Sequence, residues 1–289
     1  MQTFIQDFTT RQYMVGSDFE FFHYADKPTM EVEYHNHDFY EVFFLISGKV
    51  NYIIEGKSYI LKPGDIVLIN NKELHKPVIE PESAYERVVI WINPDFIKRK
   101  ITDGTNLFMC FENTSKNKFN LLRLGSEILN IIKHIVTKLN KVCSNASYGS
   151  DILKELYVIE LIVYLNRAYL ENCDEDMEDD IMYDPKVNEI ILYINQNLNT
   201  DLSLEALSAR FFTSKYHLLR EFKKHTGYTL HNYIHQKRLI AAKSHLKAGI
   251  RVTDVCQMCG FGDYSNFIRS FRKAYNISPK KYAHTNLGT

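Results

Sequence analysis

Hydrophobic positions repeat with two different periods along the chain. Over residues 20–95, short apolar or alternating runs such as 50–55 and 66–69 are separated by turn residues. Short strands at this spacing are typical of an antiparallel sandwich or barrel. Over residues 121–170, and again over 184–289, apolar residues recur three and four positions apart, which predicts helices. The pattern therefore predicts an α+β protein, with a β-barrel, helices that follow it, and a C-terminal all-α domain.

An acidic stretch separates these parts. Residues 174–180, with the sequence DEDMEDD, are almost entirely acidic and cannot form a buried core. We therefore expect a solvated linker over 174–183. Asp184 and Pro185 follow as a good helix start, because the acid can cap the helix and the proline N–H would have no helical partner. The expected domains are residues 1–173 and 184–289.

The formal net charge of zero conceals opposite charges in the two halves. Residues 1–183 carry 19 Lys and Arg against 28 Asp and Glu, a net charge of −9, whereas residues 184–289 carry 16 against 7, a net charge of +9. A basic half of this kind favours contact with a polyanion.

The remaining composition favours a globular cytoplasmic protein. Residues of hydrophobic type make up 45% of the chain, yet no apolar run approaches the roughly 18 residues of a membrane span. The first residues show no export signal. Five scattered cysteines do not suggest a disulfide framework, which favours a reducing compartment.

The basic half contains an internal repeat at an offset of 49 residues. Ser214 aligns with Asp263, and both are good N-cap residues. Gly227 aligns with Asn276, and both can end a helix in the left-handed conformation. The aligned pairs between these ends are Leu218 with Phe267, Arg220 with Arg269, Phe222 with Phe271, Lys223 with Arg272 and Lys224 with Lys273.

Each copy, over residues 203–226 and 252–275, predicts a short helix, a tight turn and a basic second helix. This is the helix-turn-helix pattern, whose second helix enters the major groove of DNA. The helical wheel directs one set of side chains outward from the second helices. They are Lys215, Tyr216, Leu219, Arg220 and Lys223 in the first copy and Tyr264, Ser265, Ile268, Arg269 and Arg272 in the second. Arginine can bind guanine O6 and N7, and neighbouring cations neutralise phosphates.

Residues 229–247 separate the two copies and contain neither Gly nor Pro. They predict one helix about 29 Å long, which is close to the roughly 34 Å of one turn of B-DNA. A rigid spacer of this length would place the two second helices in successive major grooves.

This half resembles the AraC/XylS family of transcription regulators. The resemblance rests on LEALS at 204–208, SKYHLLREFKK at 214–224, GFGDYSNFIRSFRK at 260–273 and ISPKKY at 277–282. It implies that family DNA contacts fall on Tyr216, Leu219, Arg220, Tyr264, Ser265, Asn266 and Arg269. Leu219 departs from a hydrogen-bonding role, because it can contact only apolar atoms such as a thymine methyl group.

Cys256 and Cys259 form a CxxC motif, which is found in redox pairs and in zinc sites. No second CxxC or histidine pair is arranged to complete a zinc site. At the offset of 49 the two cysteines fall on Leu207 and Arg210, in the short first helix. Because cysteine packs well as a small hydrophobic residue, we expect a place in the core.

In the N-terminal half, His35, His37 and Glu41 share one face of a strand-like run. A Pro-Gly-Asp turn at 63–65 and then His75 follow, and together they resemble the cupin pattern. Three histidines and a glutamate directed into a small barrel are suitable ligands for Fe, Mn, Ni or Zn. The same four residues could instead line an effector pocket or be structural.

The family resemblance extends into this half and favours the effector pocket. It rests on residues 40–41, Gly48, 61–65, Asn70, 73–75 and 86–89. Regulators of this kind often carry a cupin-like sensing barrel without a metal. We therefore expect no cofactor and no catalysis, with His35, His37, Glu41 and His75 as effector-pocket candidates.

Two predicted helices, over 121–140 and 150–170, follow the barrel and should pack against it. The second is also a candidate homodimer seam, which would increase avidity for DNA. The leading hypothesis is a cytoplasmic transcription regulator that binds double-stranded DNA and a small, sugar-like effector, with RNA polymerase as a further candidate partner. The alternatives are a metal-dependent cupin enzyme with a helical appendage and an effector-independent architectural DNA-binding protein.

Overall fold

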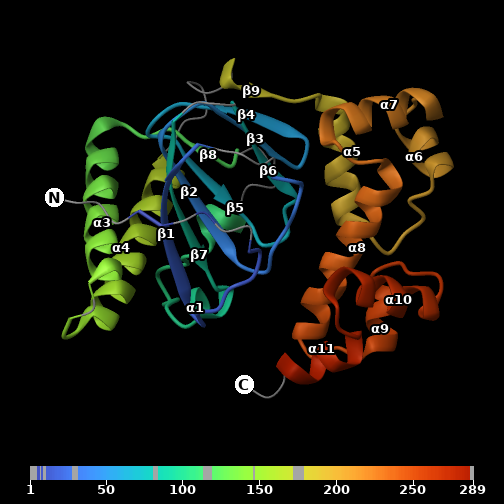
Figure 1. The fold of residues 1–289 in the computed structure, drawn as a ribbon. Coiled ribbons are helices and arrows are strands. Elements are labelled where there is room, and N and C mark those ends of the chain that lie inside the picture. The colour runs from blue at the N-terminus through green and yellow to red at the C-terminus, as the bar shows by residue number, and fades with distance from the viewer. Residues whose placement is uncertain are drawn as a thin grey trace. The chain divides into compact units, whose positions relative to one another are not determined.

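The structure is a computed structural model that describes residues 5, 6, 8, 11–27, 32–80, 84–112, 119–145, 147–171 and 179–286. It contains two compact units, Met1–Ile54 with Ser58–Met182, and Glu55–Lys57 with Tyr183–Thr289. The first unit holds the strands and the second is helical (Figure 1), so the predicted α+β class is confirmed. Among the described residues, no helix has a long enough apolar stretch to cross a bilayer.

Two sheets form the N-terminal unit. The first contains, in spatial order, β1 (Phe19–Asp26), β7 (Tyr85–Ile92), β2 (Tyr40–Ser47), β5 (Ile66–Ile69) and β8 (Leu121–Leu122). The second contains β6 (His75–Ile79), β3 (Val50–Ile54), β4 (Lys57–Leu61) and β9 (Ile181–Met182). The described strands thus make a two-sheet, cupin-like barrel whose sheets are not joined into one closed sheet.

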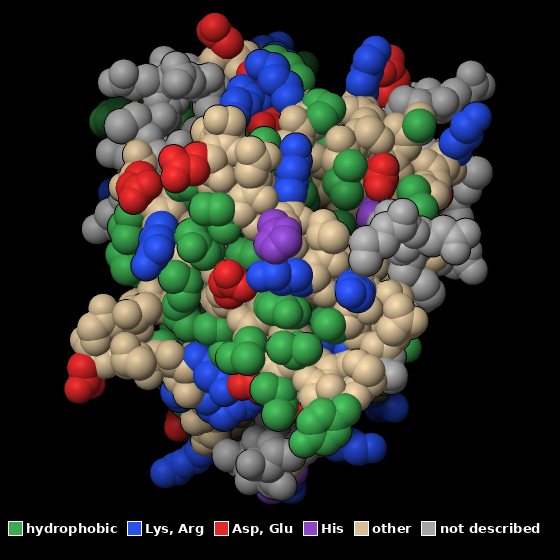
Figure 2. All heavy atoms as spheres, turned by 90° about the vertical axis from the view of Figure 1, so that its left-hand side faces the viewer, with side chains coloured by type: hydrophobic (Ala, Val, Ile, Leu, Met, Phe, Trp, Pro, Cys, Tyr) green, Lys and Arg blue, Asp and Glu red, His purple; other side chains and the backbone are tan. Residues whose placement is uncertain are grey.

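Alternate residues of β2 belong to two different cores, as a strand period of two predicts. Phe43 and Leu45 pack in the barrel interior, whereas Val42 and Phe44 pack on the opposite side of the sheet. That second side is covered by the helices α3 (Ser126–Ser144) and α4 (Ser150–Glu171), whose inward residues join the same core. Figure 2 views the molecule from the side of these helices, where hydrophobic side chains lie among charged ones.

Residues 101–120, which lie between the predicted strands and the predicted helices, contribute a short helix. The helix α2 (Met109–Glu112) buries Cys110 and Phe111. The helix α1 (Pro94–Lys98) precedes this segment and begins after Asn93, whose side chain caps it.

The end of the expected acidic linker is packed against the first unit. Residues 172–178 lie outside the described part of the chain. Beyond them, Ile181 is buried and pairs with Tyr59 of β4, and Asp180 accepts hydrogen bonds from Lys62 and Arg123. Strand pairing and two cations therefore hold residues 180–182, which the sequence assigned to a solvated linker.

The helical unit consists of seven helices over its described residues. They are α5 (Pro185–Gln196), α6 (Leu204–Arg210), α7 (Lys215–Thr226), α8 (Leu230–Lys247), α9 (Val252–Met258), α10 (Tyr264–Tyr275) and α11 (Pro279–Asn286). Asp184 caps α5 through the backbone N–H of Val187, as the sequence predicts. The spacer helix α8 has 18 residues and is thus about 27 Å long.

Candidate DNA-binding surface and a buried histidine cluster

The second helix of each helix-turn-helix motif is capped at both ends. Ser214 Oγ accepts a hydrogen bond from the backbone N–H of His217, and Asp263 Oδ1 accepts one from that of Asn266. At the other ends, Gly227 and Asn276 have left-handed backbones, with φ of 75° and 57°. These caps fix the limits of α7 and α10.

The inward faces of the two helices are apolar. Leu218 and Phe222 of α7 and Phe267 and Phe271 of α10 are almost fully buried. The structure places all of the predicted DNA-binding residues on the exposed surface. They are Lys215, Tyr216, Leu219, Arg220, Lys223, Tyr264, Ser265, Asn266, Arg269 and Arg272.

A hollow of about 610 Å³ is bordered by α8 and by one residue each of α7 and α10. Leu219 lines it from α7, Asn266 from α10, and His231 and Arg238 from the spacer α8. The part of α8 that lines it carries histidine and arginine side chains that sequence reasoning did not single out.

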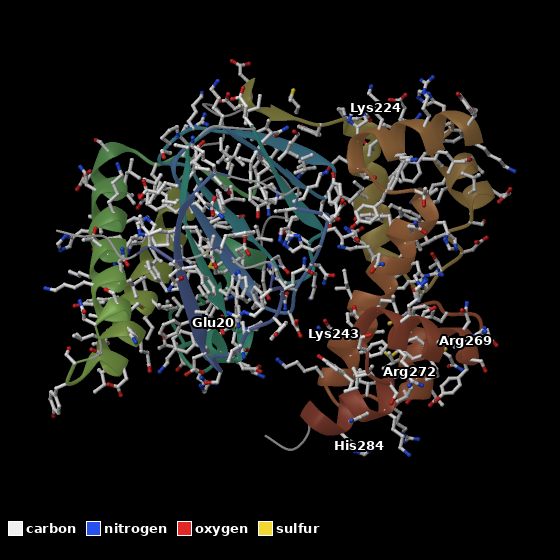
Figure 3. All side chains as sticks on the ribbon, in the orientation of Figure 1. Glu20, Lys224, Lys243, Arg269, Arg272 and His284 are labelled. Atoms are coloured by element: carbon white, nitrogen blue, oxygen red, sulfur yellow. The ribbon has the colours of Figure 1, made fainter. Side chains whose placement is uncertain are left out.

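The cations on the two helices have different surroundings. Arg220 of α7 donates a hydrogen bond of 2.9 Å from Nε to Glu221, and Lys215 pairs with Glu205 of α6. Arg269 and Arg272 of α10 project from the domain (Figure 3) and make no ion pair or hydrogen bond with any residue that the structure describes. The positive charge of α10 is thus more available to a phosphate or a base.

The first helices of the two motifs align at an offset of 48, not the 49 that the second helices share. The helices α6 and α9 begin at Leu204 and Val252, and the turn of the second motif is one residue longer. Val255, rather than Cys256, therefore takes the place of Leu207, and both are fully buried.

The cysteines of the CxxC motif are reduced and lie in the core of the second motif. Cys256 and Cys259 are buried, and Cys256 Sγ lies 3.6 Å from the carbonyl oxygen of Phe261. Burial raises the pKa of the Cys259 thiol to about 12, so that it stays protonated at neutral pH. This environment agrees with the expected packing role.

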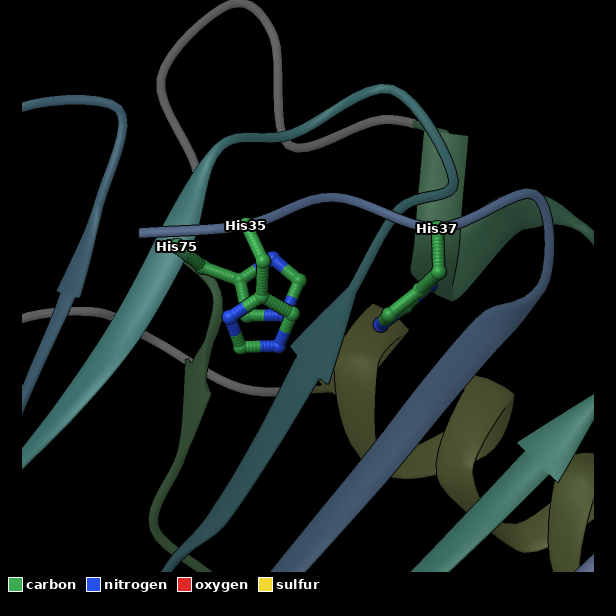
Figure 4. Close-up of side chains that lie close together, drawn as sticks. All are labelled: His35, His37 and His75. Carbon is green, nitrogen blue, oxygen red and sulfur yellow. The ribbon is translucent and has the colours of Figure 1, made fainter. Parts of the chain in front are cut away.

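In the N-terminal unit, the structure brings His35, His37 and His75 together (Figure 4). His35 and His75 are paired by two backbone hydrogen bonds of 3.1 and 3.0 Å, in an isolated bridge before β2 begins at Tyr40. His35 and His37 thus lie in an extended segment ahead of the strand, not within it. One ligand atom from each histidine lies within 4.8 Å of the others.

Each of the three imidazoles is oriented by a backbone carbonyl two residues away. The Nδ1 atoms of His35, His37 and His75 lie 2.9, 2.8 and 3.0 Å from the carbonyl oxygens of Glu33, Phe39 and Glu73. Because a carbonyl only accepts, each Nδ1 carries the proton in these contacts. Burial lowers the pKa of His35 and, more strongly, of His75, which favours neutral rings.

Glu41 lies beside the cluster but differs from the expected fourth ligand. Its two carboxylate oxygens accept hydrogen bonds from Tyr52 at 3.1 Å and from Trp91 Nε1 at 3.0 Å. Burial by itself would raise the pKa of Glu41, but interactions with His37, together with those of His75 and His35, outweigh it and lower the pKa to about 2. Glu41 is therefore a buried anion held by two donors. Sequence reasoning missed both donors, since they come from β3 and β7.

The barrel interior around these residues is filled by aromatic side chains. His37 stacks on Phe39 with ring centroids 3.9 Å apart, and Phe39 contacts Trp91 at 4.6 Å. Phe43 and Tyr52 continue this packing at 5.1 Å. The polar cluster is thus enclosed by a hydrophobic wall, which limits the size of a ligand that it can accept.

Comparison with known proteins identifies the class. Residues 20–162 match the AraC-like ligand binding domain, and residues 207–285 match a helix-turn-helix domain. With the fold and the exposed helices, these matches define a sequence-specific DNA-binding transcription regulator with a ligand-binding domain. The chain belongs to the AraC family of transcription regulators, as the sequence resemblance predicted.

Curated relatives match the chain over most of their length. The chain is 24% identical over 254 residues to the HTH-type transcriptional activator RhaS of Salmonella schwarzengrund (strain CVM19633), with 85% of each chain covered. It is 25% identical over 248 residues to RhaS of Enterobacter sp. (strain 638), with 86% of each covered.

Two solved structures also match the chain. Unsaturated fatty acid-bound wild-type ToxT from Vibrio cholerae strain SCE256 is 16% identical, with a TM-score of 0.38 over 95% of this chain and 98% of that one. The C-terminal domain of the response regulator yesN from Fusobacterium nucleatum subsp. nucleatum ATCC 25586 is 31% identical, with a TM-score of 0.32 over 33% of this chain and 94% of that one.

Proposed function

We propose that α7 and α10 contact base edges in two successive major grooves, with α8 as the rigid spacer. The observation that carries this proposal is that both helices bury their apolar faces and expose the predicted DNA-binding side chains. The length of α8, about 27 Å, is compatible with the roughly 34 Å between successive major grooves on one side of B-DNA. Arg220 and Arg269 are the residues best suited to contact guanine.

Selection of bound fragments from random DNA tests this proposal. The full-length protein should enrich a site with two short motifs about one helical turn, or roughly 10 base pairs, apart. A single enriched motif would show that only one helix contacts bases. Enrichment without sequence preference would leave only phosphate binding.

The N-terminal unit is the regulatory part in this proposal. A small effector, which we expect to be polar and in the simplest case sugar-like, would bind at the cluster of His35, His37, Glu41 and His75. Two observations support this position: the cluster is buried, and it contains ring nitrogens without a hydrogen-bond partner. The effector changes DNA binding only if it has different affinities for two states of the protein.

Removal of one pocket residue tests the regulatory role. The His37→Ala variant should lose the response of DNA binding to the effector while binding to the selected DNA site persists. A His37→Ala variant with a normal response would exclude the cluster as the effector site. His134→Ala is a matched control, because His134 is an exposed histidine of α3 in the same unit.

A homodimer in the cytoplasm is the expected working form, with RNA polymerase as a further partner on DNA. The helix α4 exposes Ile152, Leu153 and Leu156. Three apolar side chains on one exposed stretch favour a protein contact. Leu156→Asp should therefore shift the protein to monomer in sedimentation velocity, and an unchanged dimer would exclude this seam.

A further inference from the structure

The connection between the two units ends in a segment that is fixed to the first unit. The strand β9 (Ile181–Met182) pairs in antiparallel register with Tyr59 and Ser58 of β4. The second unit begins at the next residue, Tyr183. The last residues before the DNA-binding unit are thus held by a sheet of the N-terminal unit.

Two cations hold Asp180, the residue before this strand. Its Oδ2 accepts hydrogen bonds of 2.5 Å from Lys62 Nζ and from Arg123 Nη1. Arg123 is itself fixed, because its Nε and Nη2 donate to the two carboxylate oxygens of buried Asp65, at 2.9 and 2.7 Å. Arg123 therefore offers its third nitrogen in a set position, and Asp180 binds to a preformed site.

The strand also contributes a side chain to the barrel interior. Ile181 is 6% exposed and belongs to the same apolar core as Phe43 and Tyr52. The Tyr52 hydroxyl donates a hydrogen bond to Glu41 of the proposed effector site. Packed side chains thus join that site to the connection, so that a change in the packing of the core can loosen β9.

The attachment is small enough to open by itself. The strand β9 pairs through only two residues at the edge of its sheet, and Met182 is 53% exposed. Ion pairs close to the surface stabilise a fold only weakly. Short attachments of this kind are among the least stable parts of a fold and open without global unfolding.

The attachment sets the length of the tether between the two units. With β9 in place, residues 183–184 alone separate it from α5, and two residues span at most about 7 Å. Without β9, the tether extends from the end of α4 and comprises residues 172–184, which span at most about 45 Å. A paired β9 therefore limits how far the two units can separate.

The charges of the two units give this length a consequence. Residues 1–183 carry a net charge of −9 and residues 184–289 a net charge of +9. The phosphates of DNA repel the first and attract the second. An acidic unit on a short tether stays near the DNA that the basic unit binds, whereas a longer tether allows it to move beyond the range of the repulsion.

We propose that residues 180–182 form a latch that regulates DNA binding through the length of the tether. In the closed latch, β9 is paired, Asp180 is held by Lys62 and Arg123, and the nearby acidic unit weakens DNA binding. In the open latch, the tether is longer and DNA binding is tighter. The inference rests on the proposed function and specifies how a change in the barrel reaches the DNA-binding unit.

Hydrogen exchange of the full-length protein, measured by mass spectrometry, tests whether these contacts hold the segment. Asp180→Asn weakens both ion pairs, and Ile181→Ala removes the buried side chain without a change of charge. Exchange over residues 180–183 should be roughly tenfold faster in both variants. Glu80→Gln is the matched control, because it removes the same charge from the ion pair with Lys49 in the same unit. Exchange at the wild-type rate in Asp180→Asn and Ile181→Ala would overturn the proposal.

Fluorescence anisotropy with a random-sequence DNA duplex tests the effect on DNA binding. At low salt, Asp180→Asn and Ile181→Ala should bind about threefold more tightly than the wild type, and the gain should shrink as salt screens the charges. Glu80→Gln should show a smaller gain. If Glu80→Gln gains as much as Asp180→Asn while Ile181→Ala gains nothing, net charge alone acts and the proposal is wrong.

A disulfide that locks the latch gives the opposite test. Ser58 and Met182 face each other across the two strands, where Cα atoms lie about 4.5–5.5 Å apart, within the range of about 4.4–6.8 Å that a disulfide bridges. In the oxidised Ser58→Cys/Met182→Cys variant, adding Asp180→Asn should no longer tighten DNA binding, and a reductant should restore the gain. An oxidised variant that still gains as much would show that the tether has no role.

The random duplex also separates this inference from the proposed function. A protein that selects no DNA sequence, but binds the random duplex more tightly when the latch is open, would refute base recognition by α7 and α10 and support the latch. Selection of a DNA site together with equal affinities of the open and locked variants would support base recognition and refute the latch.

Discussion

The turn between the two helices of each motif contains one residue with a left-handed backbone. In the first motif this residue is Phe212, with φ of 47°, and in the second it is Gly260, with φ of 73°. The same hydrogen bonds surround both positions: Thr213 N–H donates to Ser208, and Phe261 N–H donates to Cys256. One backbone geometry is thus built once from phenylalanine and once from glycine.

The difference lies in what surrounds the two residues. The Phe212 side chain is 93% exposed and meets little of the protein. At Gly260, an added Cβ would lie 2.2 Å from the carbonyl oxygen of Leu198 and 2.9 Å from Arg238. The turn of the second motif therefore packs directly on the segment after α5, whereas the turn of the first stands in solvent. In the second motif, packing requires glycine at position 260. In the first motif, glycine at position 212 would only relieve the strain of the left-handed backbone.

Gly260→Ala should give the largest effect. A left-handed backbone costs a residue with a Cβ about 1–2 kcal/mol, and overpacking against the Leu198 carbonyl adds about 1–3 kcal/mol. We expect the free energy of unfolding to fall by about 2–5 kcal/mol, the sum of the two costs, in urea denaturation followed by circular dichroism. The control is Gly262→Ala, where an added Cβ meets nothing within 4 Å. Equal losses in both variants would show that packing on Leu198 is unimportant.

Arg269→Ala should give the next largest effect, on DNA binding rather than on stability. Arg269 has no ion pair or hydrogen bond within the described structure, so its full contribution is available to DNA. Its loss should cost about 1–3 kcal/mol and relax base preference at one position, measured by fluorescence anisotropy on the selected site. Arg220→Ala should cost less, because Arg220 must first leave Glu221. A uniform loss across all DNA sequences would mean that Arg269 contacts only phosphate.

Phe212→Gly should give a small effect of opposite sign to Gly260→Ala. Glycine removes about 1–2 kcal/mol of left-handed strain but adds about 0.5–1 kcal/mol of backbone entropy to the unfolded chain. We expect a net stabilisation of about 0.5 kcal/mol, measured by urea denaturation. Phe212→Ala, which keeps a Cβ at this position, should not be stabilised. A destabilised Phe212→Gly variant would show that the exposed ring has a packing role.

These two turns also show where prediction from the sequence succeeded and where it failed. The capped helices α7 and α10 were predicted because their caps and apolar positions are local, as at Ser214 and Asp263. The alignment of the first helices was one residue wrong because the extra residue, Gly262, lies in a turn where neither periodicity nor burial fixes the register. A loop insertion leaves no trace in the periodicity of either helix.

In the N-terminal unit, too, the sequence predicted the features that depend on neighbouring residues and missed those that depend on residues distant in the chain. The period of two correctly placed His35, His37 and Glu41 on one side of the chain. The role of Glu41 could not be predicted, because its hydrogen-bond donors Tyr52 and Trp91 are distant in sequence and meet it only through strand pairing. The two-residue strands β8 and β9 were missed for the same reason.

Glu221→Gln should have the smallest effect and tests the electrostatic part of the comparison. Glu221 contacts Arg220, Lys224 and His225, whereas α10 carries no acidic residue along its length. Neutralising Glu221 should release Arg220 and make α7 resemble α10. DNA binding should tighten slightly at low salt, and the gain should diminish as salt screens the exposed charges.

In Glu221→Gln, the cost of Arg220→Ala should approach that of Arg269→Ala. If the two arginine effects stay as different as before, the contrast between the motifs arises from how each helix lies in its groove, not from Glu221.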